Sequence, residues 1–383
     1  MFSQQRIASL QSHPTPFYLY DLGLLDKTLS AMKAASVKHN YHVHYALKAN
    51  SNREILSHIE KSGMGADCVS GNEIKRALEC GFSPDKIVFA GVGKSDAEIR
   101  FALANEIFCF NCESLPEIEV IAQLAREENK KAGIALRINP NVQANTHHYI
   151  TTGLEENKFG INIYELPEVI ECVQKYPQLE LIGIHFHIGS QITDLAVFRS
   201  LCLRVNEIQE WFASRRITLK HINVGGGLGV DYHEPEKNAV PDFETYFEIF
   251  SKFLEVRPGQ QIHFELGRAI VAQCGALISR VLYVKKGKQT NFAILDAGMT
   301  ELIRPALYQA YHKIENLTPS PGATDIRYDV VGPVCESSDC FGKAMDLPEV
   351  KRGDLIAIRT AGAYGEVMVS GYNLREREET VYF

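Results

Sequence analysis

Lys48 is the residue of this sequence whose position most directly suggests covalent chemistry. It follows residues 42–47, a short apolar run with the composition of a buried strand. Burial disfavours the charged ammonium, so it would lower the pKa of this lysine and free its amine as a nucleophile. Such an amine can form a Schiff base with a carbonyl group. A lysine that caps its strand in solvent is the alternative, and the residue alone does not decide between them.

Other apolar runs also end in polar or glycine residues. In a (β/α)₈ barrel, the carboxyl ends of the strands line the active site. If these runs are the strands of one barrel, a single mouth therefore collects their terminal residues. In chain order these residues are Lys48, Asp67, Arg137, His187, the glycines after Val224, and Glu265 with Arg268.

A glycine-rich run at residues 224–229 is a candidate phosphate site. Glycines let backbone N–H groups approach an anion closely, and the N-terminus of a following helix would add a favourable dipole. Ser190 could add a hydroxyl to the same phosphate. The run does not match the dinucleotide pattern G-x-G-x-x-G, and a simple turn is the alternative.

Two histidines and a glutamate complete the first set of candidates. His185 and His187 fall on one face of the expected strand. They could be a metal pair, a stacking surface for a cofactor ring or part of the core, but no carboxylate or cysteine is spaced nearby to complete a metal site. Glu265 ends an apolar run and needs a cationic partner if it is buried. Arg268, Arg137 or a protonated ring nitrogen could supply that partner.

The elements expected to position these residues alternate between strands and helices, which implies a parallel sheet. Eight such units match a closed α/β barrel in size, with an open doubly wound sheet as the alternative. We predict strands at residues 42–47, 65–69, 86–90, 107–111, 133–139, 181–188, 221–225 and 261–266. Helices are predicted at residues 52–62, 71–80, 95–104, 115–129, 164–175, 195–214 and 242–254.

The pattern changes after about residue 269, where strand-like runs follow one another with few helical stretches. We therefore predict a barrel over residues 24–270 and a C-terminal β-rich domain over residues 1–23 and 271–383. Its expected strands are 17–20, 277–284, 291–296, 327–332, 355–359 and 366–369. In this half, Cys335 stands beside Glu336, and such a thiol could act in acid–base chemistry because its reactivity depends on local charge. Solvated loops would also explain these polar segments.

Composition bounds the class of protein. The 383 residues carry a formal charge of −7, which argues against a nucleic-acid surface. No run of about 18 apolar residues is present, so we predict no membrane span. The nine cysteines and the polar N-terminus are typical of a cytoplasmic protein with reduced thiols. A lone C-x-x-C at residues 109–112 has no second pair, so zinc is not expected.

Taken together, the motifs resemble those of the fold-type III pyridoxal-phosphate-dependent decarboxylases, most closely the diaminopimelate decarboxylases. The resemblance runs from about residue 16 to residue 372. One departure is Leu266, where that family usually has proline, and we expect altered rigidity but the same roles. The motifs that carry the resemblance are residues 45–50, 185–191, 224–229, 265–268, 304–308, 335–339 and 363–365.

The resemblance implies pyridoxal 5′-phosphate as the cofactor and no metal. Lys48 would hold the cofactor covalently, His187 would stack on its ring, and Glu265 would accept the proton of its ring nitrogen. Asp67 and Arg137 would support the ring and the lysine. The phosphate and the edge of the cofactor would be held by Ser190, Gly225, Gly226, Gly227, Gly267, Arg268 and Tyr364.

The resemblance also implies the substrate and the assembly. The reaction would convert meso-2,6-diaminopimelate to L-lysine and CO₂, the last step of lysine biosynthesis. Cys335 would donate a proton after CO₂ leaves. It and Glu336 would reach the site from a second subunit, so we expect a homodimer with shared active sites. The substrate would be bound by Arg268, Arg304 and Tyr308 at its distal carboxylate, by Glu336 at its distal ammonium, and by Tyr364.

Other classes remain as alternatives. Ornithine or arginine decarboxylases share the expected fold, but their substrates end in cations, whereas Arg268 and Arg304 suit a carboxylate. Alanine racemase needs a second base and lacks the Cys335–Glu336 segment. A binding or regulatory relative without activity should have lost Lys48 or Cys335. A metal-dependent barrel hydrolase would reveal itself by metal dependence.

Overall fold

The computed structural model describes residues 2–142, 158–376 and 379–383, which form two compact units. We call residues 29–229 and 242–267 the barrel unit, and residues 1–28, 230–241 and 268–383 the sheet unit. Each unit has its own hydrogen-bonded sheet and its own buried core. Within the described part of the chain, no helix has both the length and the apolar character that a membrane span requires.

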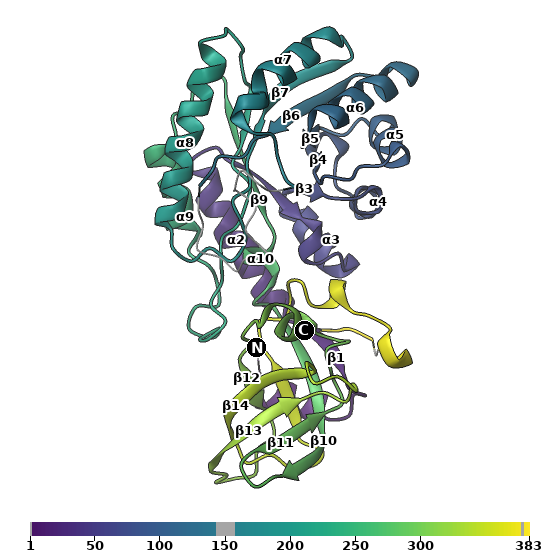
Figure 1. The fold of residues 1–383 in the computed structure, drawn as a ribbon. Coiled ribbons are helices and arrows are strands. Elements are labelled where there is room, and N and C mark those ends of the chain that lie inside the picture. The colour runs from purple at the N-terminus through teal and green to yellow at the C-terminus, as the bar shows by residue number, and fades with distance from the viewer. Residues whose placement is uncertain (1, 143–157, 377–378) are drawn as a thin grey trace. The chain divides into compact units, whose positions relative to one another are not determined.

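The barrel unit is a closed barrel of eight parallel strands, as predicted (Figure 1). Neighbours in sequence pair side by side, and the last strand pairs with the first through Tyr45 and Leu266. This closure leaves no sheet edge and gathers the carboxyl ends of all eight strands at one mouth. The strands are β2 (His42–Ala46), β3 (Gly65–Cys68), β4 (Ile87–Phe89), β5 (Cys109–Cys112), β6 (Ala132–Arg137), β7 (Leu179–His185), β8 (His221–Asn223) and β9 (Gln261–Leu266).

The seven helices predicted between the strands are confirmed, and they cover the outside of the barrel (Figure 1). Several begin at a side-chain cap: Asn52 accepts from the backbone N–H of Glu54, and Ser70 accepts from that of Glu73. The helices are α3 (Arg53–Lys61), α4 (Gly71–Glu79), α5 (Asp96–Ala104), α6 (Leu115–Glu127), α7 (Leu166–Lys175), α8 (Ala196–Ala213) and α9 (Phe243–Phe253).

One long helix, α2 (Leu22–Val37), was not predicted. Its apolar residues are spread around the helix, so the sequence lacks the periodicity that marked the others.

Aromatic packing fixes the last strand of the barrel. The ring of Phe264 on β9 meets Phe247 and Phe250 of α9 edge-on, with ring centroids 4.8 and 4.9 Å apart. All three side chains are fully buried. Each such burial stabilises the fold by roughly 1.5–3 kcal/mol. The neighbouring residue Glu265 is therefore held on a rigid strand.

The sheet unit contains one eight-stranded sheet in the order β12-β15-β10-β11-β13-β14, with β1 paired to β10 and β16. Residues 17–20 join this sheet as predicted, since Phe17 pairs with Ile278 in an antiparallel ladder. Its strands are β1 (Phe17–Tyr20), β10 (Gly275–Lys286), β11 (Asn291–Leu295), β12 (Ile314–Asn316), β13 (Asp325–Val331), β14 (Cys340–Pro348), β15 (Leu355–Ile358) and β16 (Val381–Tyr382).

The predictions for the sheet unit were wrong in two places. Residues 366–369, expected as a strand, form instead the 3₁₀ turn η5 (Glu366–Met368). Strands β12, β14 and β16 were missed. β14 is half-exposed and owes its conformation to β13, with which it pairs along most of its length. Because this strand depends on pairing with another segment, the local sequence of β14 does not predict it. Three short helices complete the unit: α1 (Gln4–Leu10), α10 (Arg268–Val271) and α11 (Arg304–Tyr308).

Candidate active site

Lys48 lies just past the end of β2, in the single 3₁₀ turn η1 (Leu47–Ala49), and the strand ends one residue earlier than predicted. Its ammonium Nζ is 3.1 Å from Oδ2 of Asp67, which lies on the adjacent strand β3. The side chain of Lys48 is 36% exposed, whereas that of Asp67 is fully buried. The amine of Lys48 is therefore held by the buried carboxylate of Asp67, while its side chain stays accessible to a ligand.

Asp67 carries an unsatisfied buried oxygen. Within the described residues, its Oδ1 has no hydrogen-bond partner. Burial, together with the charge of Glu265, raises the pKa of Asp67, while Lys48 acts in the opposite direction. Buried polar atoms are almost always hydrogen-bonded, so this oxygen indicates a polar group that does not belong to the chain.

Glu265 accepts three hydrogen bonds from side chains at the barrel mouth. Oε1 accepts from Nδ2 of Asn111 at 3.0 Å and from Nδ2 of Asn223 at 2.7 Å. Oε2 accepts from Nε2 of His185 at 2.9 Å. Burial alone raises the pKa of a carboxyl group, but here the interactions with His185 and Lys48 outweigh it and hold the pKa of Glu265 well below its usual range.

This arrangement fits a protonated ring nitrogen. A carboxylate offers about four acceptor positions, and the three donors leave one of them on Oε2 of Glu265. An ionised carboxylate held in a buried site attracts a cationic N–H strongly. The orphaned Oδ1 of Asp67 and the accessible amine of Lys48 lie at the same end of the barrel. The residues present are thus suited to pyridoxal phosphate.

The two histidines of β7 have separate surroundings, contrary to their predicted pairing on one strand face. The strand ends at His185, whose imidazole faces Glu265, and His187 lies beyond the strand. Burial, together with the charges of Lys48 and Arg137, lowers the pKa of His187 well below its usual value. A neutral imidazole is compatible with stacking on an aromatic ring.

Ser190 lies in the loop that follows β7, and that loop is tied to the glycine run. The backbone N–H of Ile192 donates to the carbonyl of Gly227 at 2.9 Å, and that of Gly229 donates back to Ile192 at 2.9 Å. The two loops predicted to share a phosphate are therefore adjacent.

Only glycine fits at the start of the glycine run. A Cβ on Gly226 would lie 1.9 Å from the carbonyl oxygen of Glu265, and one on Gly225 would lie 2.1 Å from that of Phe186. Gly225 and Gly227 also have positive φ angles of 72° and 106°. The predicted helix dipole is absent, because the next helix, α9, begins only at Phe243. Any anion here would be held by backbone N–H groups without a helix. Gly267, two residues past Glu265, packs less tightly: its Cβ would lie 3.0 Å from that of Ala49.

Arg137, at the end of β6, has a buried partner that the sequence did not reveal. Its Nη1 lies 2.6 Å from Oε1 of Glu113. Glu113 also accepts from the backbone N–H groups of Gly91 at 3.2 Å and Gly160 at 2.9 Å. The guanidinium stacks over the ring of Phe159. Arg137 therefore ties together loops that follow three strands of the barrel.

The sheet unit contains a second cluster, built on two buried arginines. Nη1 of Arg268 donates to the hydroxyl of Tyr232 at 2.6 Å, and Nε of Arg304 donates to Nε2 of His312 at 3.3 Å. Both guanidinium groups lie over the ring of Tyr232, at 6.0 and 5.5 Å from its centroid. Arg268 also lies 4.8 Å from the ring centroid of Tyr364.

This cluster is rich in positive charge. Arg304 is 6% exposed, and among the described residues it forms no ion pair with a carboxylate. Burial, and then the charge of Arg268, lower the pKa of Arg304, while Tyr232, Tyr364 and Tyr308 oppose that shift. A buried cation with neutral partners is costly unless an anion binds beside it. The cluster is therefore suited to bind an anion.

Cys335 and Glu336 lie in the turn between β13 and β14, and both are exposed. The turn is held by Asp339, whose carboxylate accepts from the backbone N–H groups of Met299 at 2.6 Å and Val334 at 2.7 Å. Oε1 of Glu336 accepts from the hydroxyl of Tyr372 at 2.9 Å.

Sequence reasoning missed five residues of these clusters: Asn111, Glu113, Asn223, Tyr232 and His312. The two asparagines stand on strands close to predicted site residues, which is a usable signal, but they were passed over because amides are uncharged. Tyr232 and His312 are 36 and 8 residues away from the arginines they contact, and no local pattern links them. Across the described residues, no group of three metal-ligating side chains is assembled, and Cys109 and Cys112 are buried on β5.

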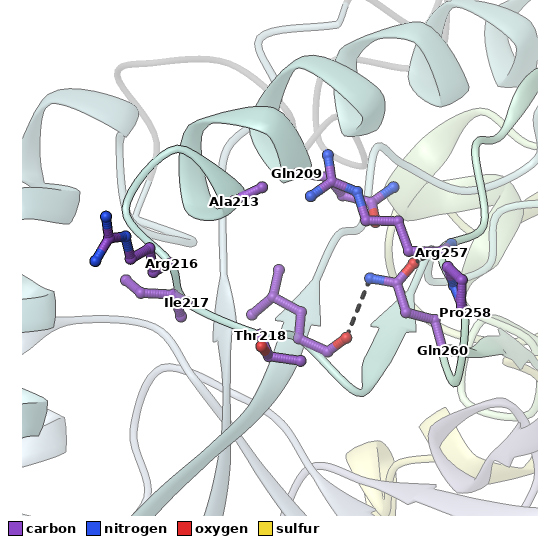
Figure 2. Close-up of a pocket in the computed structure, with 9 residues that line it drawn as sticks. Gln209, Ala213, Arg216, Ile217, Thr218, Arg257, Pro258 and Gln260 are labelled. Atoms are coloured by element: carbon purple, nitrogen blue, oxygen red, sulfur yellow. Dashed lines mark hydrogen bonds between the residues drawn. The ribbon is translucent and has the colours of Figure 1, made fainter.

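Two cavities lie at the opposite end of the barrel. One, of about 300 Å³, lies between the C-terminal end of α8 and the loop before β9 (Figure 2). It is lined by Gln209, Arg216, Arg257 and Gln260 among others. The second, of about 330 Å³, is lined by His42, His44, His263 and Phe108 among others. Both adjoin the amino ends of strands, so neither belongs to the site around Lys48.

Comparison with known proteins gives consistent matches. Residues 22–272 match the family model of the pyridoxal-dependent decarboxylases, pyridoxal binding domain. The chain is 60% identical over 363 residues to the diaminopimelate decarboxylase of Bacteroides thetaiotaomicron, covering 94% of each protein. A crystal structure of the Helicobacter pylori diaminopimelate decarboxylase complexed with L-lysine matches with a TM-score of 0.92 and 44% identity, covering 98% of this chain and 93% of that chain. The corresponding M. jannaschii complex matches with a TM-score of 0.91 and 32% identity, covering 99% and 89%.

Proposed function

Because this chain belongs to the pyridoxal-dependent decarboxylases, and among them to the diaminopimelate decarboxylases, we propose how its own side chains perform that reaction. The enzyme uses pyridoxal phosphate to decarboxylate diaminopimelate in lysine biosynthesis. When bound, the cofactor supplies an electron sink for the bond that breaks as CO₂ leaves. The remaining tasks fall to the protein: to bind, to orient and to move protons.

Lys48 holds the cofactor through its amine. Support comes from the accessible Nζ and the buried carboxylate of Asp67 that anchors it at 3.1 Å. Glu265 keeps the proton on the ring nitrogen, because its carboxylate is ionised and has one acceptor position left. His187, kept neutral by its surroundings, lies against the ring. Arg137 acts through its charge and through the loops that it ties to Glu113.

The phosphate is bound mainly by backbone groups. Gly225, Gly226 and Gly227 present N–H donors with no Cβ in the way, and the neighbouring loop adds the hydroxyl of Ser190. Gly267 and Arg268 in the turn after β9, together with Tyr364, complete this part of the site.

Arg304 and Arg268 bind the distal carboxylate of the substrate, with Tyr308 and Tyr364 beside them. The observation that carries this assignment is the buried Arg304, which has a neutral histidine as its hydrogen-bond partner and no carboxylate among the described residues. Substrates of ornithine or arginine decarboxylases have a cation at that position, which two arginines would repel. The substrate class therefore follows from the charge of the cluster.

Replacement of Arg304 tests this assignment. We expect Arg304→Ala to raise KM for diaminopimelate about tenfold or more, which corresponds to the roughly 1.5 kcal/mol of a charge-assisted hydrogen bond. Arg304→Lys should recover part of that loss. Arg327→Ala is the matched control, since Arg327 makes an exposed ion pair with Asp346. An unchanged KM in Arg304→Ala would place the distal carboxylate elsewhere.

Cys335 donates the proton that replaces CO₂, and Glu336 binds the distal ammonium, each from the second subunit of a homodimer. Support comes from their exposure and from exposed large side chains in the same unit. Tyr372, which contacts Glu336, is 49% exposed, and Leu374 is 93% exposed. Exposed apolar residues of this size are typical of an interface.

We assign most of the cofactor-binding residues to the barrel unit, and the substrate site and the dimer interface to the sheet unit, which also supplies Arg268 and Tyr364 to cofactor binding. The predicted domains 24–270 and 1–23 with 271–383 stay a prediction. The cytoplasmic location stays a prediction from the sequence.

A further inference from the structure

Resting on this proposed function, we infer that His312 is a positioning residue that sets the preference for ligands with a distal carboxylate, by holding the guanidinium of Arg304 with a neutral acceptor. His312 touches neither the reacting atoms nor, by this account, the substrate. Its effect passes through Arg304, whose Nε donates to it at 3.3 Å.

The hydrogen bonds of His312 fix its tautomer. Its Nδ1 lies 2.8 Å from the backbone carbonyl of Arg359, and a carbonyl can only accept. Nδ1 must therefore carry the proton. Nε2 is then left with a lone pair, which is what the N–H on Nε of Arg304 requires. If His312 were protonated, the N–H on its Nε2 would face the N–H on Nε of Arg304. The hydrogen bond between His312 and Arg304 therefore requires the neutral imidazole.

The surroundings keep that ring neutral and immobile. His312 is 1% exposed and meets the ring of Tyr232 edge-on at 5.1 Å. Burial, and then the charge of Arg304, lower the pKa of His312 to about 3. The carbonyl that holds Nδ1 is itself fixed, because the N–H of Arg359 donates to the carbonyl of Lys313 at 2.8 Å and its guanidinium lies 2.6 Å from Glu315.

A neutral acceptor on Nε has a specific consequence for ligand binding. It orients Arg304 and leaves the positive charge of the guanidinium intact. A carboxylate partner would instead cancel that charge. The neutral acceptor also uses only one of five N–H groups and leaves the four on Nη1 and Nη2, which are those that form a two-point contact with a carboxylate. In the described part of the chain, no hydrogen bond to these four groups is observed. His312 thus orients Arg304 so that its charged guanidinium keeps the N–H groups of Nη1 and Nη2 for the ligand.

A pair of ligands isolates this effect. L-Lysine carries the distal carboxylate, and 1,5-diaminopentane is the same chain without it. Their affinities for the holoenzyme are measured by calorimetry for the wild type, His312→Leu and His312→Gln, with the melting temperature of each variant as a check on folding. Leucine fills the space without an acceptor, whereas glutamine can both accept from Arg304 and donate to Arg359.

We expect His312→Leu to weaken lysine binding about tenfold, the scale of a lost hydrogen bond to a charged group, and to change diaminopentane binding less than twofold. His312→Gln should restore most of the preference. KM for diaminopimelate should rise in the leucine variant by more than kcat falls.

Two other results would overturn the inference. Equal weakening of both ligands would mean a general structural role, and an unchanged preference would mean that Arg304 is positioned without His312. Failure of the proposed function would look different: the wild type would then show no preference for lysine, or Arg304→Ala would leave that preference intact.

Discussion

Nε2 of His185 donates a 2.9 Å hydrogen bond to Oε2 of Glu265, and both side chains are almost completely buried at the mouth of the barrel. Asn111 and Asn223 supply two further donors to the same carboxylate. Strands β5, β7 and β8 thus each contribute one donor to a residue of β9. The barrel fixes the position and the charge of Glu265 before any ligand arrives.

Glu265→Gln therefore tests the role of charge at nearly constant shape. The neutral amide does not stabilise a protonated ring nitrogen as the carboxylate does, and its NH₂ group opposes one of the three donors. We expect a folded protein that binds the cofactor but loses at least about a hundredfold in kcat, roughly 3 kcal/mol of transition-state stabilisation. Steady-state kinetics on the reconstituted enzyme measure this. A kcat within threefold of the wild type would contradict the role assigned to Glu265.

The shared active site is tested by combining two inactive variants. Lys48→Ala should lose both activity and the visible absorption of lysine-bound cofactor, and Cys335→Ala should lose most activity while it keeps that absorption. If Cys335 acts in the partner's site, a purified heterodimer of the two variants has one site with both changes and one with neither. We expect about half of the wild-type activity per dimer. An inactive heterodimer would place Lys48 and Cys335 of one chain in the same site.

Gly226→Ala tests the packing of the glycine run. The added Cβ would lie 1.9 Å from the carbonyl oxygen of Glu265, so the loop or β9 must move. We expect a loss of roughly 1–3 kcal/mol in stability and weaker cofactor binding, measured by urea unfolding and by titration with pyridoxal phosphate. Gly93→Ala is the control, since nothing lies within 4 Å of its Cβ position. Equal behaviour of the two variants would argue against the close approach.

Stability should depend on pH through a chain of buried histidines at the other end of the barrel. His44 contacts the carbonyl of Lys86 and Nδ1 of His263, and Nε2 of His263 contacts Nδ1 of His221, each at 3.0 Å. Since the carbonyl only accepts, it sets the tautomers of all three rings in turn. Burial lowers the pKa of His44 to about 4 and that of His263 well below its usual value.

Because these pKa values lie below the unfolded value of about 6.5, the unfolded chain binds more protons than the folded one as the pH falls. The contribution of the neutral histidines is complete above about pH 6.5 and is lost as the pH falls to about 4. For His44 it amounts to roughly 3 kcal/mol. Urea unfolding at several pH values should show a smaller slope in this window for His44→Gln. The exposed His13, replaced in the same way, is the control. An unchanged slope in His44→Gln would contradict the prediction.

How far the sequence predicts this protein can be judged from particular residues. Lys48 and Glu265 were identified because a charged side chain at the end of an apolar run is unusual, and the structure places both at the barrel mouth. The strands of the barrel and the helices between them were recovered because their periodicity is local. Asn111, Tyr232 and His312 were not identified, because each contributes to a site only through contact with a residue that is distant in the sequence and close in the fold.

The boundary errors have a similar cause. β2 and β7 end at Ala46 and His185, earlier than apolar composition predicted, so Lys48 lies in η1 and His187 in the loop after β7. The helix that follows the glycine run, α9, begins only at Phe243 and so does not adjoin that run, since residues 230–241 belong to the sheet unit. The roles of the individual site residues stay predictions, and the variants above address them.

The most direct test of the account is the substrate profile of the purified protein. The protein is incubated with pyridoxal phosphate and meso-diaminopimelate, and in parallel with ornithine and with arginine, while CO₂ and the amine products are measured. We expect lysine and CO₂ from diaminopimelate and no product from the two basic amino acids. CO₂ from ornithine or arginine instead would contradict the assignment of Arg304 and Arg268 to a distal carboxylate.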